Sequence, residues 1–166
     1  MSVSYDKNTL RQLKDGLLPY EKAHQMQSHF KDTDRFQKML EIWQESVEWD
    51  DRILLPLAEH LFVALKPDGR RVVKSTWGHE YCEAHENWKL YAKVFVRDTP
   101  ALMNEVYPDK LGAHTDWMQI REFYDPISGV LLEVEAVPPG YPFVHDFKPD
   151  IDTFYNEWLG IPVPEA

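Results

Sequence analysis

Apolar residues near the start of the chain recur every three to four positions, which is the period of an amphipathic helix. Four leucines in residues 9–18 fall on one helical face, and residues 20–30 continue the pattern after a proline suited to a first turn. The longest such stretch follows Asp32 and Thr33, either of which is able to cap a helix, and continues to Val47. The pattern therefore predicts three N-terminal helices.

The pattern then changes to short apolar runs that are typical of strands. Residues 53–57 form one such run, and Pro56 within it favours an edge position, because proline donates no hydrogen bond to a neighbouring strand. Two further runs, 61–66 and 71–75, flank Pro67-Asp68-Gly69, a sequence typical of a tight turn. These runs predict a β-hairpin beside an irregular edge strand.

A second group of elements is predicted further along the chain. Alternating apolar positions in residues 88–96 indicate another strand of the same sheet. Thr99-Pro100 supplies a capping hydroxyl and a first-turn proline, which predicts a short central helix. Residues 117–124 and 130–137 predict a second hairpin around the turn 125–129. The sheet is therefore expected to contain about five strands.

The last part of the chain combines prolines with aromatic residues. Residues 138–149, which we call the arm, hold too many prolines for regular structure and too many apolar side chains for a free linker. We therefore expect the arm to lie against another surface. A final helix is expected to begin at Asp150 or Asp152 and to stop at Gly160.

Together these elements predict an α+β fold with a mainly antiparallel sheet built from hairpins. Because no linker-like composition interrupts the chain, we expect a single domain over residues 1–166. Its parts are a helical region (1–48), a sheet region (53–137) and a region with the arm and the last helix (138–166).

Composition narrows the classes of function. The chain has 28 acidic and 18 basic residues, a formal charge of -10, so nucleic acid is not expected as a partner. No apolar run is long enough for a membrane span and the N-terminus does not resemble a signal peptide, which favours a cytoplasmic protein without a membrane role. Six Trp, eight Tyr and eight Phe exceed what the core needs, which favours a partner surface for some of them.

Two predicted hairpin tips gather the residues that are most suited to chemistry. The stretch from Ser75 to Asn87 contains the candidate metal ligands His79, Cys82 and His85. A zinc knuckle needs a second ligand pair from another hairpin, and the second tip offers only Asp125 and Ser128. Because hydroxyls are poor zinc ligands, the alternative is two tips held by packing and hydrogen bonds.

The sequence gives less support to other catalytic arrangements. Cys82 as a nucleophile needs a lowered thiol pKa, and the neighbouring Glu80 and Glu83 disfavour the thiolate. The chain also has two carboxylate pairs, Asp50 with Asp51 and Glu133 with Glu135. Such pairs are more typical of a solvated face than of a catalytic acid and base. The chain has no glycine-rich phosphate loop, GxSxG, HExxH or dinucleotide motif, so it predicts no reaction of its own.

Five strings of residues carry a further signal: WDDRILLPL, GHEYC, ENWKLYAKVFVRDTP, REFYDPISG and FVHDFKPDIDTFYNEWLGIPVPE. Together and in this order they resemble the gamma subunit of acetone carboxylase. The resemblance extends from about Gly16 to Glu165. It implies a small, non-catalytic structural subunit of an ATP-dependent enzyme that converts a ketone and bicarbonate to a β-keto acid such as acetoacetate.

The resemblance also implies partners and cofactors. Two large subunits, α and β, would complete an α2β2γ2 assembly and hold the ATP and manganese sites, while the small subunit carries zinc. The family's zinc motifs are CxCGHxxC and CPxC, and the five cysteine positions correspond here to Ser75, Trp77, Cys82, Asp125 and Ser128.

Because four of these five cysteines are replaced, no cofactor or metal is expected in this chain. The remaining candidate ligands are His79, Cys82 and Asp125, in a degenerate zinc-ribbon-like knuckle that Trp77 and hydrogen bonds would hold together. Two alternatives to a carboxylase subunit are a stand-alone binding or scaffold module and a stand-alone metal- or cysteine-dependent enzyme. The enzyme would use His79, Cys82 and His85.

Overall fold

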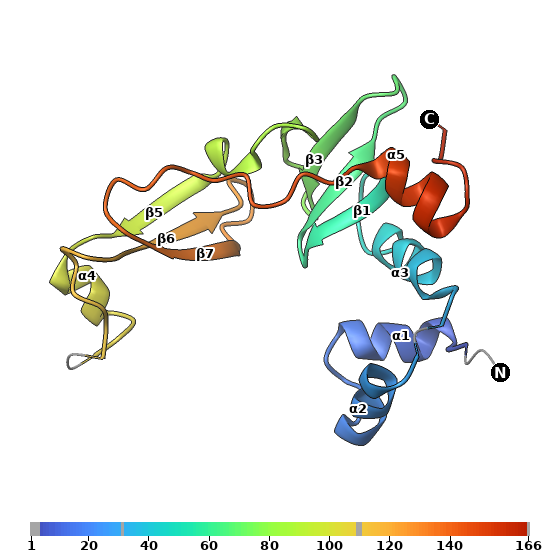
Figure 1. Cartoon of the computed structure of the whole chain (residues 1–166), viewed down its shortest axis with the longest axis horizontal. Coiled ribbons are helices and arrows are strands. Elements are labelled where there is room, and N and C mark those ends of the chain that lie inside the picture. Colours follow the sequence, from blue (N-terminus) through green and yellow to red (C-terminus); the bar gives the residue numbers. More distant parts are fainter. Residues whose placement is uncertain (1–3, 31, 109–110, 166) are drawn as a thin grey trace. The chain divides into compact units, whose positions relative to one another are not determined.

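The structure, a computed structural model, describes residues 4–30, 32–108 and 111–165 (Figure 1). It confirms the predicted α+β class with antiparallel sheets. The chain forms two compact units, residues 1–47 and 48–166, and the single domain over both stays a prediction. Among the described residues, no helix combines the length and the apolarity that crossing a membrane requires.

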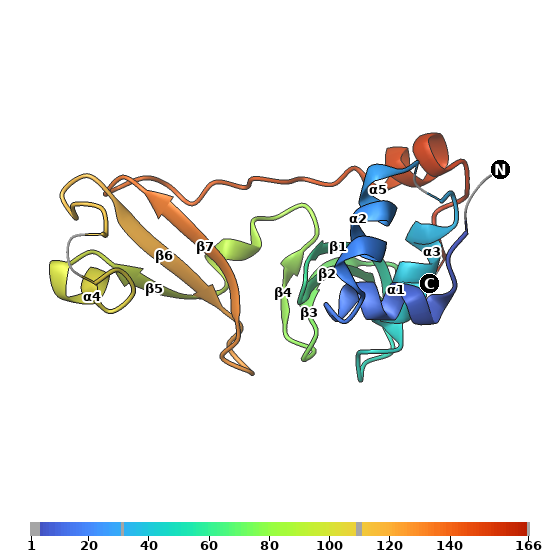
Figure 2. The ribbon, with the colours of Figure 1, turned by 90° about the horizontal axis from the view of Figure 1, so that it is seen from below.

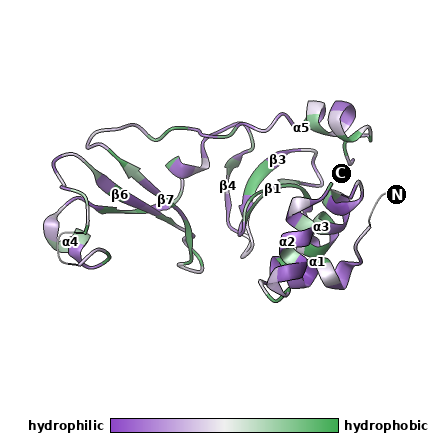
Figure 3. Cartoon of the chain, turned by 60° about the horizontal axis from the view of Figure 1, so that its bottom comes forward, coloured by the Kyte–Doolittle hydropathy of each residue, from purple (hydrophilic) through white to green (hydrophobic). Residues whose placement is uncertain are grey.

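The first unit contains the three predicted helices, α1 (Lys7–Lys14), α2 (Tyr20–Ser28) and α3 (Arg35–Gln44). Asp6 caps α1, because its carboxylate accepts a hydrogen bond from the backbone N–H of Thr9 at 2.9 Å. The apolar faces of the helices meet in one cluster, whose buried members are Leu10, Leu18, Met26 and Ile42. In Figure 3 these helices show hydrophilic and hydrophobic colours side by side, as expected of amphipathic helices.

The start of α3 differs from the prediction that Asp32 or Thr33 caps it. The residue before the helix is Asp34, and its side chain makes no capping hydrogen bond, because it accepts a hydrogen bond from Ser4 and pairs with Lys38. Asp32 is buried instead, where its carboxylate lies 2.6 Å from Nε of Arg35. A charged pair has replaced the expected cap.

The second unit begins with a four-stranded antiparallel sheet in the order β1-β2-β3-β4. Its strands are β1 (Arg52–Ala58), β2 (Leu61–Leu65), β3 (Arg71–Ser75) and β4 (Glu80–Glu83). All residues of β2 are buried, and Figure 3 shows much of β1 and β3 in the hydrophobic colour. The predicted hairpin of β2 and β3 is confirmed. Strand β1 lies at the edge, as Pro56 indicates, and its register with β2 is irregular there.

A three-stranded antiparallel sheet follows, in the order β5-β6-β7. Its strands are β5 (Lys93–Arg97), β6 (Gln119–Tyr124) and β7 (Leu131–Val137). The 3-10 helix η1 (Trp88–Leu90) precedes β5, and the helix α4 (Pro100–Asn104) lies between β5 and β6 in the chain. The second predicted hairpin, β6 with β7, and the central helix α4 are confirmed. Thr99 caps α4 through its hydroxyl, as predicted.

The prediction of about five strands in one sheet was wrong, since the described residues form two sheets with seven strands. The predicted strand 88–96 starts instead with η1, because the side chain of Asn87 accepts a hydrogen bond from the N–H of Lys89 at 3.2 Å. Trp88 then enters the core, and the chain turns before β5 pairs with β6.

An aromatic core joins the two sheets of the second unit. Its buried residues are Leu61, Val73, Tyr81, Cys82, Trp88 and Phe123. The rings make a chain of edge-to-face contacts: centroids lie 5.9 Å apart for Tyr81 and Trp88, and 5.8 Å apart for Trp88 and Phe123. Residues from both sheets therefore share one core.

The arm contains no helix or strand, in agreement with its prolines, and runs from the end of β7 back to the first sheet (Figure 2). It lies against its own unit: the guanidinium of Arg121 donates to the carbonyl of Tyr141, and the amide of Asn87 donates to the carbonyl of Phe143 at 3.1 Å. The expected supporting surface is therefore at least in part the β5-β6-β7 sheet and η1.

The predicted C-terminal helix is confirmed as α5 (Ile151–Thr153), which continues into the π-helical turn η2 (Phe154–Leu159). Asp150 caps it, and Gly160 ends it in the left-handed conformation. The buried hydroxyl of Tyr155 donates to the carbonyl oxygen of Leu54 in β1 at 2.8 Å. This contact fixes the last helix to the first sheet.

Candidate functional site

The first hairpin tip is the tight turn between β3 and β4. The backbone N–H of Ser75 donates to the carbonyl of His79 at 2.9 Å, and Gly78 between them has a φ of +88°, which a residue with a side chain rarely adopts. The indole N–H of Trp49 donates to the carbonyl of Ser75 at 3.1 Å. The turn is therefore closed by its own backbone and by Trp49.

The second tip is organised by the buried side chain of Asp125, directly after β6. Its Oδ1 accepts hydrogen bonds from the backbone N–H groups of Ile127 at 3.0 Å and Ser128 at 2.7 Å, and from the Ser128 hydroxyl at 3.0 Å. A side-chain carboxylate that accepts from residues two and three positions later is a common way to stabilise a turn.

The two tips meet at this carboxylate. The phenol of Tyr81 in β4 donates to Oδ2 of Asp125 at 2.9 Å, in a buried hydrogen bond, and the side chain of Ser75 hydrogen-bonds to the same carboxylate. We call this set of five residues the Asp125 hub; its members are Ser75, Tyr81, Asp125, Ile127 and Ser128. The hub joins the β1-β2-β3-β4 sheet to the β5-β6-β7 sheet.

The electrostatics of the hub favour a charged Asp125. Burial by itself raises the pKa of this carboxyl group, but the hydrogen bonds from Ser128, Ser75 and Tyr81 outweigh it and hold the pKa below its ordinary value. Burial and the neighbouring Asp125 in turn raise the pKa of the Tyr81 phenol. The hub is therefore an anion surrounded by neutral donors.

The donor set of the hub does not fit zinc. Ser75 and Ser128 offer hydroxyls, which are poor ligands, and the carboxylate of Asp125 already accepts hydrogen bonds on both oxygens. The ring of Trp77 packs at a tilt against the ring of His60, with centroids 4.8 Å apart, and has no ligand atom to offer. In the part of the chain that the structure describes, no three His, Cys, Asp or Glu side chains converge at the hub.

The other predicted site residues do not come together either. Cys82 is buried in β4, where its thiol donates to the carbonyl of Glu86 over 3.8 Å. Burial, with the carboxylates of Glu86 and Glu83, raises the pKa of the Cys82 thiol to about 12. The ring of His79 packs edge-on against Tyr81, and His85 is exposed. The thiol is therefore protonated and not poised as a nucleophile.

Sequence reasoning missed a buried cation, Lys89. Its side chain is 2% exposed, and its ammonium lies 2.6 Å from a carboxylate oxygen of Glu133, 2.6 Å from one of Glu135, and in contact with Asp146. Burial by itself lowers the pKa of Lys89, but the three carboxylates outweigh it and raise the pKa. Glu133 and Glu135 are thus ion-pair partners and not an acid and base.

These three carboxylates are the single group within the described residues that has the spacing of a metal site. The ammonium of Lys89 already lies among them and opposes a second cation. The i, i+2 spacing of the two glutamates did place both on one face of β7, but nothing local indicated that Lys89 would be their partner. One member of the other predicted acidic pair also has a cation partner, since Asp51 lies 2.6 Å from the ammonium of Lys74.

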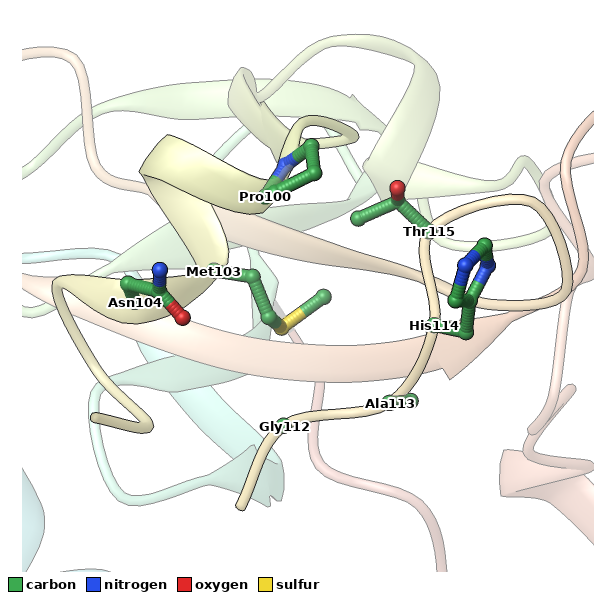
Figure 4. Close-up of a pocket in the computed structure, with 7 residues that line it drawn as sticks. All are labelled: Pro100, Met103, Asn104, Gly112, Ala113, His114 and Thr115. Atoms are coloured by element: carbon green, nitrogen blue, oxygen red, sulfur yellow. The ribbon is translucent and has the colours of Figure 1, made fainter. Parts of the chain in front are cut away.

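A cavity of about 720 Å³ lies between α4 and the loop before β6 (Figure 4). Its lining residues are Pro100, Met103, Asn104, Gly112, Ala113, His114 and Thr115. The side chain of Met103 occupies the space between helix and loop in Figure 4. One imidazole, one amide and one hydroxyl without a charged partner in the lining do not make a catalytic arrangement.

The hub predicts a large loss of stability when its anion is removed. Asp125→Ala leaves buried donors from both tips unpaired, so we expect the free energy of unfolding to fall by about 3 kcal/mol or more. Asp125→Asn keeps the acceptor and should cost about half as much. Urea unfolding measures both, with the exposed Asp116→Ala as a control that should change stability by less than about 0.5 kcal/mol.

The pH dependence provides a second measurement of the same residue. Because the folded pKa of Asp125 is lowered, its charge contributes stability that is fully present above the ordinary carboxyl pKa and is lost as the pH falls through the folded value. The stability difference between wild type and Asp125→Asn should therefore be constant above about pH 5 and shrink as the pH falls from about 5 to about 3. A difference that stays constant between about pH 5 and about pH 3 contradicts the assignment of the charge to Asp125.

The environment of Cys82 predicts an unreactive thiol. With a pKa of about 12, the thiol is almost entirely protonated near pH 8, and the side chain is buried. Iodoacetamide should therefore label the folded chain far more slowly than the chain in urea, as followed by intact mass. Labelling at similar rates in both states would show that Cys82 is accessible and activated.

Comparisons of the sequence with known proteins identify the family of this chain. A family profile described as "Acetone carboxylase gamma subunit" matches residues 47–159, which include both hairpin tips and the whole arm. The "Acetone carboxylase gamma subunit" of Xanthobacter autotrophicus strain Py2 is 44% identical to this chain over 164 residues, which are 98% of each of the two chains. This confirms the resemblance found in the five sequence strings: the chain belongs to the acetone carboxylase gamma subunit family.

Proposed function

We propose that this chain is the small, structural subunit of an ATP-dependent ketone carboxylase, an enzyme that converts an acetone-type ketone and bicarbonate to a β-keto acid such as acetoacetate. The observation that carries the proposal is the 44% identity, over 98% of both chains, to a protein named as the gamma subunit of acetone carboxylase. A gamma subunit is by its name one chain of an enzyme with several subunits.

The environment of the polar residues supports a role without catalysis in this chain. The Cys82 thiol is buried and has a raised pKa, the Asp125 carboxylate is surrounded by donors, and the Lys89 ammonium is enclosed by three carboxylates. A catalytic acid, base or nucleophile needs access to a substrate and a free coordination or hydrogen-bonding position. None of these three groups offers one in the described structure, which also weakens the alternative of a stand-alone cysteine or metal enzyme.

The proposed partners are two large subunits, α and β, in an α2β2γ2 assembly that holds the ATP and manganese sites. The aromatic content supports a chain that works in an assembly, since several large apolar side chains remain exposed in the described residues. The acidic charge supports protein partners over nucleic acid.

Removal of single components tests the proposal. The isolated chain should catalyse no ketone carboxylation, and the co-expressed large subunits should assemble or react normally only with the chain present. Complexes that carry His79→Ala, Cys82→Ala or His85→Ala should keep kcat within about twofold of wild type, because these residues touch no reacting atom. Carboxylation by the isolated chain, or loss of kcat in one of these variants within an intact complex, contradicts a structural role.

We further propose that the Asp125 hub serves in place of zinc in this chain. Its support is that Ser75, Tyr81 and Ser128 fill the positions around the carboxylate with hydrogen bonds that need no metal. Elemental analysis after dialysis against a weak chelator should find far less than one zinc per chain. One zinc per chain that disappears in Cys82→Ala would instead show a retained metal site.

A further inference from the structure

A group of large apolar side chains is exposed in the arm and at η1. We call it the arm patch; its members are Leu90, Tyr91, Tyr141, Phe143, Val144 and Phe147. Their exposed fractions range from 36% to 62%, with Leu90 and Phe147 the most exposed. Six such residues present on the order of several hundred Å² of apolar surface, which is as much as the largest patch of a typical monomer.

The two segments of the patch are neighbours in the fold. The side-chain amide of Asn87, which caps η1, donates to the carbonyl of Phe143 at 3.1 Å. Lys89 within η1 contacts Asp146 of the arm. Figure 2 shows the arm passing η1 on its way from β7 to α5. The arm therefore passes next to η1, which brings the exposed side chains of both segments into the same region of the second unit.

The patch is held in place before any partner binds. Arg121 donates to the carbonyl of Tyr141, and its guanidinium lies 4.7 Å from the ring centroid of Phe143. That ring also packs edge-on against Phe123 in the core, with centroids 5.7 Å apart. Because the arm is fixed from its inner side, little conformational entropy is lost when its outer side binds. Such a preorganised apolar surface is typical of an interface.

Charge and area argue against a second copy of this chain as the occupant. Carboxylates adjoin the patch: Glu86 accepts a hydrogen bond from the hydroxyl of Tyr91, and Glu133 and Asp146 lie beside Phe147. Two copies would bring these like charges together, and each copy carries a formal charge of -10. Self-pairing of the patch would also bury only on the order of 1,000 Å², below a standard interface.

We propose that the arm patch docks into an apolar groove with a basic rim on a large subunit of the carboxylase, an inference that rests on the proposed function. The groove receives Leu90 and Phe147 as anchors, while lysine or arginine side chains at its rim face Glu86, which lies outside the Lys89 ion-pair group. Other exposed apolar residues, such as Leu17 and Phe30, lie outside the region that the family profile matches.

The chain offers a matched control for this proposal. The patch variant is Leu90→Glu with Phe147→Glu, and the control variant is Leu17→Glu with Phe30→Glu, which makes the same chemical changes at exposed positions of the first unit. Tagged full-length chains are titrated against the co-expressed large subunits, and the dissociation constant is measured by interferometry. We expect the patch variant to bind about 30-fold or more weakly, and the control to stay within about threefold of wild type.

A second patch variant separates lost apolar contact from added charge and from misfolding. Leu90→Ser with Phe147→Ser should weaken binding about tenfold while the melting temperature stays that of wild type, because both side chains are exposed. If wild type binds the large subunits and both patch variants bind equally well, the arm patch is not the docking surface, and the proposed function stands.

Two other outcomes have distinct meanings. If wild type itself binds no large subunit, the proposed function fails and this inference fails with it. If light scattering finds wild type as a dimer that the patch variants convert to monomers, the occupant is a second copy of this chain and the proposal of a large-subunit groove is overturned.

Discussion

The second unit depends on one buried anion, the carboxylate of Asp125. It accepts hydrogen bonds from its own turn on one oxygen and from Tyr81 of the neighbouring sheet on the other. A buried charge is tolerated only where donors replace the lost water, so the two hairpin tips cannot separate without exposing or orphaning this group. The edge-to-face rings of the aromatic core lie in the same region and add apolar contact to this polar connection.

A second buried charge has the opposite sign and is likewise compensated by groups of the protein. Lys89 is enclosed by Glu133 and Glu135 of β7 and by Asp146 of the arm, so the ion pairs link η1, the second sheet and the arm. Removal of a single partner from such a group leaves a charge without compensation, whereas the complete group is tolerated. Together, the anion and the cation connect β4, η1, the β6-β7 hairpin and the arm.

Local signals in the sequence predicted the elements that local chemistry controls. The turn Pro67-Asp68-Gly69, the cap at Asp150 and the stop at Gly160 each act within a few residues, and all three are confirmed. The division into two sheets was missed, because it depends on Asn87 and on the burial of Trp88 in a core built from distant strands. The motif positions at the two tips were found in the sequence, but the role of Tyr81 as the donor between them has no local signature.

Two of the contacts that fix the path of the arm are made to its backbone. Arg121 and Asn87 both donate to main-chain carbonyls, at Tyr141 and Phe143, and these oxygens are present whatever the side chains are. Most outward side chains of the arm are therefore open to substitution while the scaffold beneath keeps its course. Substitutions at these side chains can therefore change which partner the arm recognises, while the fold of the chain stays the same.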